Sequence, residues 1–297
     1  MRNHAQIELL PDGRRLYLHD GPIDVVLEAF GDPGEVRTAY SAAAKRFAAI
    51  LDELCEELPL LRQRMTDDGP VLSGVIARRM AAAVAPYAPR EFITPMAAVA
   101  GAVAEEILAV MTSAAHVEKA YVNDGGDIAL HLGEGHRFTV GMIDRPDRPS
   151  LLGSALIEAR HSVRGIATSG WRGRSFSLGI ADAITVLADR AAMADAAATI
   201  IANAVDIPGH PNIQRIPARE LAPDSNLGDI AVTHDVGDLT SGEISAGLDS
   251  GVTQALELAD AGLIRAAALH LRGETRTVGM PLQTLETHEQ EPDWAHA

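Results

Sequence analysis

The chain has 297 residues, of which 47% are apolar and 4% aromatic, so it can bury a sizeable core built mainly from aliphatic and alanine side chains. Its formal net charge of −16 excludes a broad basic surface and argues against binding to nucleic acid or to an anionic membrane. The N-terminus has no signal-peptide pattern and the longest apolar run, 96–111, is interrupted by Glu105 and Glu106, so we expect a cytoplasmic protein.

The N-terminal third is predicted to form two strands followed by three helices. The strands are short apolar runs separated by a turn sequence, Asp20-Gly21-Pro22. In the helices, apolar residues recur every three or four positions, as expected for amphipathic helices packed on a core. We expect strands at 16–18 and 23–30, and helices at 35–61, 75–84 and 95–114, the last with Thr94 as its N-cap and Pro95 at its first position.

A glycine stands inside the third of these helices. In a helix interior, Gly101 costs about 1 kcal/mol relative to alanine. Its presence is explained if a neighbouring helix packs closely at this position, or if a ligand approaches this face of the helix. The sequence leaves both explanations open.

The middle of the chain is predicted to contain several short strands, at 120–122, 128–132, 137–143, 154–162 and 183–188. The first two flank the sequence Asn123-Asp124-Gly125-Gly126-Asp127. Because Asp-Gly and Gly-Gly are strong turn formers, a plain hairpin is one interpretation. The other is a glycine-lined loop where a bulky ligand can touch the backbone, flanked by carboxylates and an amide.

The stretch 165–205 carries the densest set of chemical groups. It contains a loop rich in glycine and hydroxyl groups, a buried strand, and an alanine-rich helix for which Asp189 is the expected cap. Asp195, Thr199 and Asn203 are four residues apart, so their side chains form one stripe on this helix. A carboxylate, a hydroxyl and an amide suit a hard cation such as Mg²⁺ and its phosphate ligands. A solvated polar face is the alternative interpretation.

The C-terminal third is predicted to add a helix beginning at Ser241 and a hairpin formed by 264–271 and 275–278. Strands and helices do not alternate regularly along the chain. The sequence therefore favours an α+β fold, with mixed or antiparallel sheets packed against long helices. We predict a single unit over 1–283, or two closely packed subdomains, followed by a polar tail at 284–297.

Three motifs resemble those of a known family. Residues 122–127 (VNDGGD) look like the glycine-pair motif of the FAD:protein FMN transferases, also called ApbE-like or thiamine-biosynthesis-lipoprotein proteins. Residues 167–170 (ATSG) and 194–199 (ADAAAT) are similar to that family's Ala-Thr-Ser-Gly motif and its Ala-Asp-Ala-x-Ala-Thr helix. The motifs occur in the family's order, and the resemblance is strongest to a short cytoplasmic branch of the superfamily.

This resemblance implies an ApbE-like fold and a site for FAD and Mg²⁺. Asp195 and Thr199 occupy the places of residues that help to hold Mg²⁺ at the FAD diphosphate in the transferases. The loops that line the flavin pocket correspond here to a set of candidate contacts: Asn123, Gly125, Gly126, Asp127, Thr168, Ser169 and Gly170. The implied activity is that of a Mg²⁺-dependent FMN transferase or FAD pyrophosphatase, acting by metal-assisted attack on the diphosphate. The expected partners are a nucleotide, an acceptor protein if FMN is transferred, and a second copy of the chain.

The chain also departs from the family pattern. The family's His-x-x-Asp-Pro-x-Thr-Gly segment is missing, because 171–179 contains no His, Asp or Pro, and its Lys-Gly-Tyr element is Ala100-Gly101-Ala102 here. Two alternatives follow: a flavin- or nucleotide-binding protein without catalysis, or a member repurposed for sulfur-amino-acid (homocysteine) metabolism, as suggested for some relatives. Arg172 and Arg174 of the replacement loop either meet an anionic ligand or belong to an ordinary surface loop. No catalytic residue is assigned.

Overall fold

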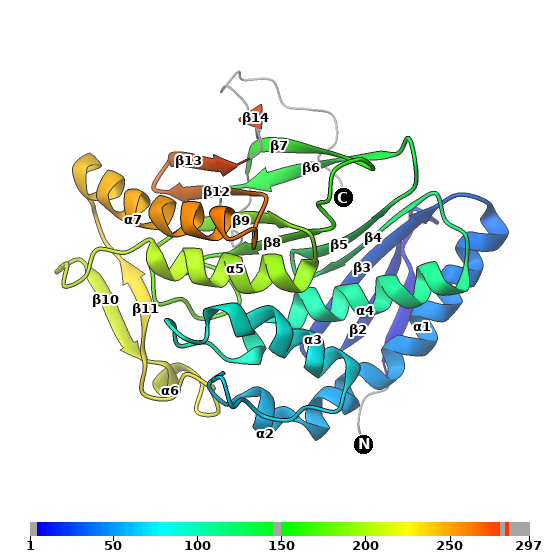
Figure 1. The fold of residues 1–297 in the computed structure, drawn as a ribbon, viewed down its shortest axis with the longest axis horizontal. Coiled ribbons are helices and arrows are strands. Elements are labelled where there is room, and N and C mark those ends of the chain that lie inside the picture. Colours follow the sequence, from blue (N-terminus) through cyan, green and yellow to red (C-terminus); the bar gives the residue numbers. More distant parts are fainter. Residues whose placement is uncertain (1–4, 145–149, 280–282, 285–297) are drawn as a thin grey trace.

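The computed structural model describes residues 5–144, 150–279 and 283–284. Its centre is a nine-stranded sheet in the order β1-β2-β3-β4-β5-β8-β9-β12-β13 (Figure 1). The strands are β1 (Gln6–Leu9), β2 (Leu16–Asp20), β3 (Ile23–Phe30), β4 (Lys119–Asp124), β5 (Asp127–Leu132), β8 (Gly165–Ser169), β9 (Ala183–Ala188), β12 (Ala266–Leu271) and β13 (Glu274–Gly279). Every strand pair in the described part of the chain is antiparallel.

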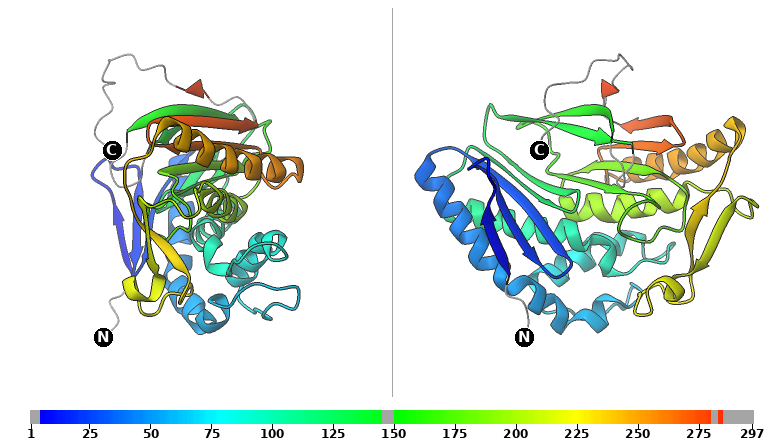
Figure 2. Two further views of the ribbon diagram at one scale, coloured as in Figure 1. Left: turned by 90° about the vertical axis from the view of Figure 1, so that its left-hand side faces the viewer. Right: turned by 180° about the vertical axis from the view of Figure 1, so that it is seen from behind.

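Helices cover one face of this sheet (Figures 1 and 2). They are α1 (Pro33–Glu56), α4 (Val99–Ala114), α5 (Ala191–Ala204) and α7 (Ser241–Asp260). Further from the sheet lie α2 (Leu58–Leu61) and α3 (Val75–Val84), which packs on α4 and α5, with 3-10 turns at Ala85–Tyr87 and Pro95–Ala98. A large hydrophobic core between sheet and helices runs along the chain from Leu16 to Val278. Its alanines let α4 and α5 approach each other and the strands closely.

The opposite face is covered only in part. A smaller sheet of β6 (Arg137–Ile143), β7 (Leu151–Glu158) and β14 (Gln283–Thr284) forms a second core that includes Leu130 of β5 and Leu187 of β9. Strand β9 is therefore buried along its whole length, because both of its faces are covered. In contrast, buried and accessible residues alternate at the start of β2, as expected for a strand with one open face. The right-hand view of Figure 2 shows this face of the sheet.

A third, two-stranded sheet of β10 (Ile213–Pro217) and β11 (Ala231–Val236) is joined by the short helix α6 (Ala218–Leu221). It packs on the loop between β8 and β9, where Thr233 N–H donates to the carbonyl of Ser177 (2.8 Å). This contact fixes one side of the loop that follows the Thr-Ser-Gly motif.

The predicted α+β class is confirmed, and the sheets are antiparallel rather than mixed. The helix predicted over 35–61 is wrong in one respect: it ends at Glu56, and α2 continues after a break at Glu57. The strand expected at 154–162 spans Leu151–Glu158. The predicted tail, 284–297, lies outside the described residues except for Thr284.

Among the described residues, one helical segment, Pro95–Ala114, is long and apolar enough to cross a membrane. Half of its most apolar stretch is buried inside the fold. It packs against α1, α3, α5 and the strands β4 and β5. These contacts are those of a core helix.

Candidate functional site

Helices α4 and α5 meet with their backbones in contact, and this contact explains Gly101. A Cβ atom at Gly101 would lie 2.5 Å from the carbonyl carbon of Ala191 and 2.7 Å from the amide nitrogen of Ala192. Of the two explanations for this glycine, close helix packing is therefore confirmed. The same contact orients the candidate metal ligand, because Gly101 N–H donates to Oδ2 of Asp195 (3.0 Å).

Each of these two helices supplies an acceptor to the first turn of the other. Asp195 on α5 accepts from α4, while Oε1 of Glu105 on α4 accepts from Ala192 N–H at the start of α5 (2.9 Å). The predicted capping role of Asp189 is wrong. Its carboxylate is held by Arg265 instead, whose Nε donates to Oδ1 (2.7 Å), and the helix begins after Arg190.

The Asn123–Asp127 segment forms a two-residue hairpin between β4 and β5, which confirms the hairpin interpretation. Gly125 and Gly126 have φ angles of +62° and +113°, which glycine adopts without strain. Oδ1 of Asn123 accepts from Gly126 N–H (2.8 Å) and closes the turn. Asp124 and Asp127 are directly paired across the hairpin, so both side chains lie on the same face of the sheet.

That face is the one covered by the helices. Asp124 follows Val122 and Ala120 at alternate positions of β4, and both of these residues belong to the helix-facing core. By the same alternation, Ser169 follows Ala167 on the helix-facing side of β8. Asp124, Asp127, Ser169 and the α5 residues are thus brought to one side of the sheet.

Two of the candidate contacts have side chains on the opposite side. The side chain of Asn123 lies in register with Tyr121, which packs on the second core, and the hydroxyl of Thr168 hydrogen bonds to that of Thr185 (3.1 Å). The backbone of Thr168 nevertheless contacts a candidate site residue, because its N–H donates to Oδ1 of Asp127 (3.2 Å). Gly170 allows a close approach: a Cβ there would lie 2.5 Å from the carbonyl oxygen of Asp182.

Asp124, Asp127 and Asp195 form a cluster of carboxylates, which we call the carboxylate cluster. Burial is the main cause that raises the pKa of Asp124 to about 7 and that of Asp195 to about 7, and Asp124 raises the pKa of Asp195 further. The pKa of Asp127 is held well above its usual range, mainly by burial and secondly by the negative charge of Asp195. The amide donors of Gly101 and Thr168 only partly offset these effects.

The carboxylate cluster offers oxygen atoms, the type of ligand that hard cations prefer. Within the described residues, none of the three carboxylates forms an ion pair with a basic side chain, and the Thr199 hydroxyl, one turn beyond Asp195, has no protein hydrogen-bond partner. Within the described ranges, no group of three or more His, Cys, Asp or Glu, these three carboxylates included, is placed so that the group could hold a metal ion. A Mg²⁺ ion is usually held by only one or two carboxylates, together with water and substrate phosphates.

Asn203, the third member of the predicted stripe, has a structural role. Its Oδ1 accepts from Leu178 N–H (2.9 Å) and from the hydroxyl of Ser177 (3.3 Å). It therefore holds the loop between β8 and β9 against α5. Asp124 was absent from the predicted contacts, although the pairing of residues on either side of a Gly-Gly turn could have identified it.

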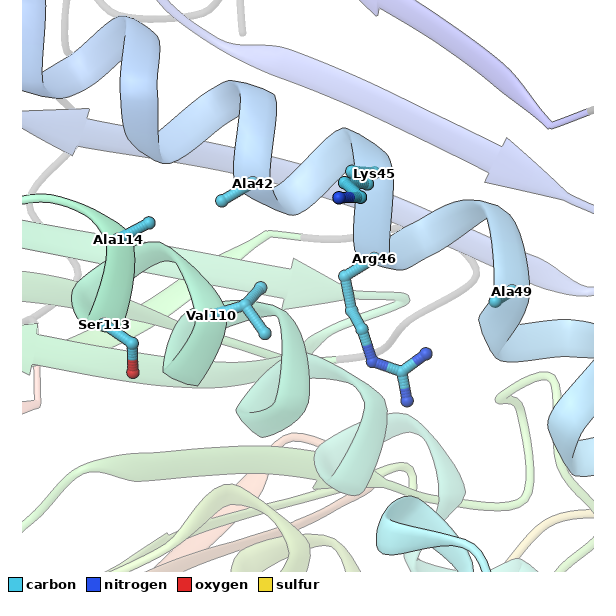
Figure 3. Close-up of a pocket in the computed structure, with 7 residues that line it drawn as sticks. All are labelled: Ala42, Lys45, Arg46, Ala49, Val110, Ser113 and Ala114. Carbon is cyan, nitrogen blue, oxygen red and sulfur yellow. The ribbon is translucent and has the colours of Figure 1, made fainter.

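A groove of about 450 Å³ lies elsewhere, between α1 and α4 (Figure 3). It is lined by Ala42, Lys45, Arg46, Ala49, Val110, Ser113 and Ala114, none of which is a candidate site residue. Arg46 is held by Glu53 and Glu106, at 2.7 and 2.8 Å. The groove is therefore separate from the carboxylate cluster.

Residues 7–277 match the model of a protein family described as AbpE bacteria. A UPF0280 protein of Methanopyrus kandleri is 39% identical over 185 residues, which are 61% of this chain and 69% of the relative. A UPF0280 protein of Methanosarcina acetivorans is 39% identical over 116 residues, so the match spans less than half of that relative, 44%.

Two solved flavin transferases are also similar in structure. The apo form of flavinyl transferase ApbE from Pseudomonas stutzeri superposes over 93% of this chain and 95% of its own, with a TM-score of 0.45 and 11% identity. Flavin transferase ApbE from Vibrio cholerae covers 92% and 97%, with a TM-score of 0.38 and 12% identity. Similarity at this level supports no residue assignment.

Proposed function

This chain belongs to the ApbE-like family, and we propose that it binds a flavin nucleotide, FAD, together with Mg²⁺ at Asp195 and Thr199. The observation that carries the proposal is the carboxylate cluster: among the described residues its three carboxylates accept backbone N–H groups but form no ion pair with a basic side chain, and Thr199 follows Asp195 by one turn of α5. Such a set of oxygen atoms without a neutralising cation favours binding of a divalent metal ion. The three sequence motifs that resemble those of the FAD:protein FMN transferases support FAD as the nucleotide.

In this proposal, Asp195 and Thr199 hold Mg²⁺, while Asp127 supplies further negative charge from the hairpin. A bound Mg²⁺ would neutralise charge that develops on the diphosphate oxygens. The protein's own contribution is to fix the ligands: Gly101 N–H orients the Asp195 carboxylate, and Thr168 N–H orients that of Asp127. Gly125, Gly126, Ser169 and Gly170 then remain as proposed contacts of the nucleotide.

We propose cleavage of the FAD diphosphate, by FMN transfer or by hydrolysis, as the first candidate activity. One observation favours binding without cleavage as the second: the loop 171–179, which is fixed by Asn203 and β11, contains no His or Asp to move a proton. An acceptor protein, a homodimer, a cytoplasmic location and a role in homocysteine metabolism stay predictions.

The experiment is incubation of the purified protein with FAD and Mg²⁺, with an EDTA control, followed by measurement of AMP and of thermal unfolding. Release of AMP identifies an enzyme that hydrolyses FAD. Stabilisation without AMP excludes hydrolysis and identifies binding, since a ligand at 100 times its Kd adds about 2.7 kcal/mol; addition of a cell extract as the source of an acceptor then tests FMN transfer.

Asp195→Asn is the informative variant, because it keeps an acceptor for Gly101 N–H and removes the charge. It is expected to lose the Mg²⁺-dependent response, whereas Asp249→Asn, at an exposed position of α7, is expected to keep it. Absence of any response to FAD in the unmodified protein would refute the proposed function.

A further inference from the structure

The two arginines of the loop between β8 and β9 differ in how the protein uses them. Arg172 is neutralised by a buried partner, since its Nε donates to Oδ1 of Asp182 (3.0 Å). Its guanidinium also stacks over the Trp171 ring, 4.1 Å from the ring centre. Arg172 is therefore engaged in holding the loop together.

Arg174, two residues further along, is exposed and lies on the hairpin of the carboxylate cluster. Its single hydrogen bond among the described residues joins Nη2 to the carbonyl of Pro22 (3.2 Å), in the turn between β2 and β3. Its Nη1 is 3.3 Å from the position that a Cβ on Gly125 would occupy. The absence of a side chain at Gly125 thus makes room for this guanidinium.

The electrostatic surroundings of Arg174 are those of an anion-binding residue next to a cation site. Its charge lowers the pKa of Asp124, but the two side chains form no ion pair within the described ranges, and burial dominates. A guanidinium has five N–H donors, and one of them is used here. The remaining donors are free for an anion, and the planar fork of arginine matches phosphate oxygens.

We propose that Arg174 binds the diphosphate of the nucleotide at the hairpin of the carboxylate cluster. This inference rests on the proposed function, because it assumes a nucleotide at the carboxylate cluster. It assigns the loop that replaces the family's His-x-x-Asp-Pro-x-Thr-Gly segment a role in phosphate recognition. The class of ligand recognised by Arg174 is a nucleoside diphosphate, of which FAD contains one.

Calorimetric titration with FAD, ADP and phosphate-free riboflavin, each with Mg²⁺, tests the proposal. Arg174→Gln is expected to weaken binding of FAD and ADP by about tenfold or more, the effect of losing a charge-assisted hydrogen bond, without changing riboflavin binding. Arg174→Lys should recover part of the loss, because it restores the charge but not the fork. Arg90→Gln removes the same charge at a side chain that is 84% exposed outside the site, and should change nothing.

Unchanged FAD and ADP binding in Arg174→Gln, with normal binding by the unmodified protein, would overturn the role of Arg174 and leave the proposed function intact. An equal loss for riboflavin would also overturn it, because the substitution would then disturb the whole site. If the unmodified protein binds neither FAD nor ADP, both proposals fail. Trp171 fluorescence checks that the loop keeps its structure in each variant.

Discussion

The contact between α4 and α5 gives a prediction with a built-in control. Gly101→Ala places a methyl group 2.5–2.7 Å from backbone atoms of Ala191 and Ala192. Neither helix backbone can move aside like a flexible side chain, so the two helices must separate by about 1 Å to reach ordinary van der Waals distance. Overpacking of this kind costs about 1–3 kcal/mol or more, whereas the gain in helix propensity is about 1 kcal/mol.

We expect Gly101→Ala to lower the free energy of unfolding by about 1–2 kcal/mol, the cost of overpacking less the gain in helix propensity. Gly247→Ala on α7 makes the same chemical change in a helix, but its Cβ would meet Leu271 and Ile207 at 3.5 and 3.6 Å, which are ordinary contacts. That variant is expected to gain about 1 kcal/mol from helix propensity. Urea unfolding followed by circular dichroism measures both variants against the unmodified protein.

A Gly101→Ala protein as stable as the Gly247→Ala protein would refute this reasoning, because the two methyl groups would then meet equivalent surroundings. The substitution also displaces the N–H that orients Asp195. We therefore expect the Mg²⁺-dependent response to FAD to fall in Gly101→Ala and to persist in Gly247→Ala.

The remaining predictions concern the polar side chains of the site. The raised pKa values of Asp124 and Asp195, about 7 against 3.8 when unfolded, mean that the ligand-free native state binds the extra protons, so its stability falls as pH rises from about 4 to 7. Thermal unfolding across this range should show a shallower fall in Asp195→Asn, and an unchanged slope would contradict the assignment. Thr199→Val should unfold at nearly the same temperature but bind FAD with Mg²⁺ more weakly by calorimetry; equal affinity would remove Thr199 from the site. Asn203→Ala leaves Leu178 N–H unpaired and should cost about 1–3 kcal/mol in urea unfolding, without altering Mg²⁺ binding.

Most strands and helices of the central sheet and the α+β class followed from patterns local to the sequence, whereas β1, β10, α6 and β11 were not predicted. Hydrophobic periodicity located α1, α4 and α5, a continuous apolar run located β9, and Gly125-Gly126 located the hairpin, because these features depend on neighbours within a few residues. Family motifs then indicated which polar residues belong together. The structure brings Asp127, Ser169 and Asp195 to the same side of the central sheet.

Partners distant in sequence could not be predicted in this way. Asp189 is a residue type that often caps helices, yet it forms an ion pair with Arg265. Glu105 instead accepts a hydrogen bond from the first turn of α5. Likewise, nothing in the sequence distinguishes Arg172 from Arg174. The two differ because the fold places Asp182 where it forms an ion pair with Arg172. Such choices depend on which strands and helices become neighbours, and local propensity carries no information about that.

The exchange of acceptors between α4 and α5 makes the two helices depend on each other. An N–H group in the first turn of α4 donates to Asp195, which lies some 90 positions later in the chain. An N–H group in the first turn of α5 donates to Glu105 of α4. Neither helix can dock in its final form before the other is present. A fragment that stops before α5 would leave the amides of Ala100 and Gly101 without the Asp195 carboxylate, so the proposed metal site cannot be transplanted or produced as a short independent piece.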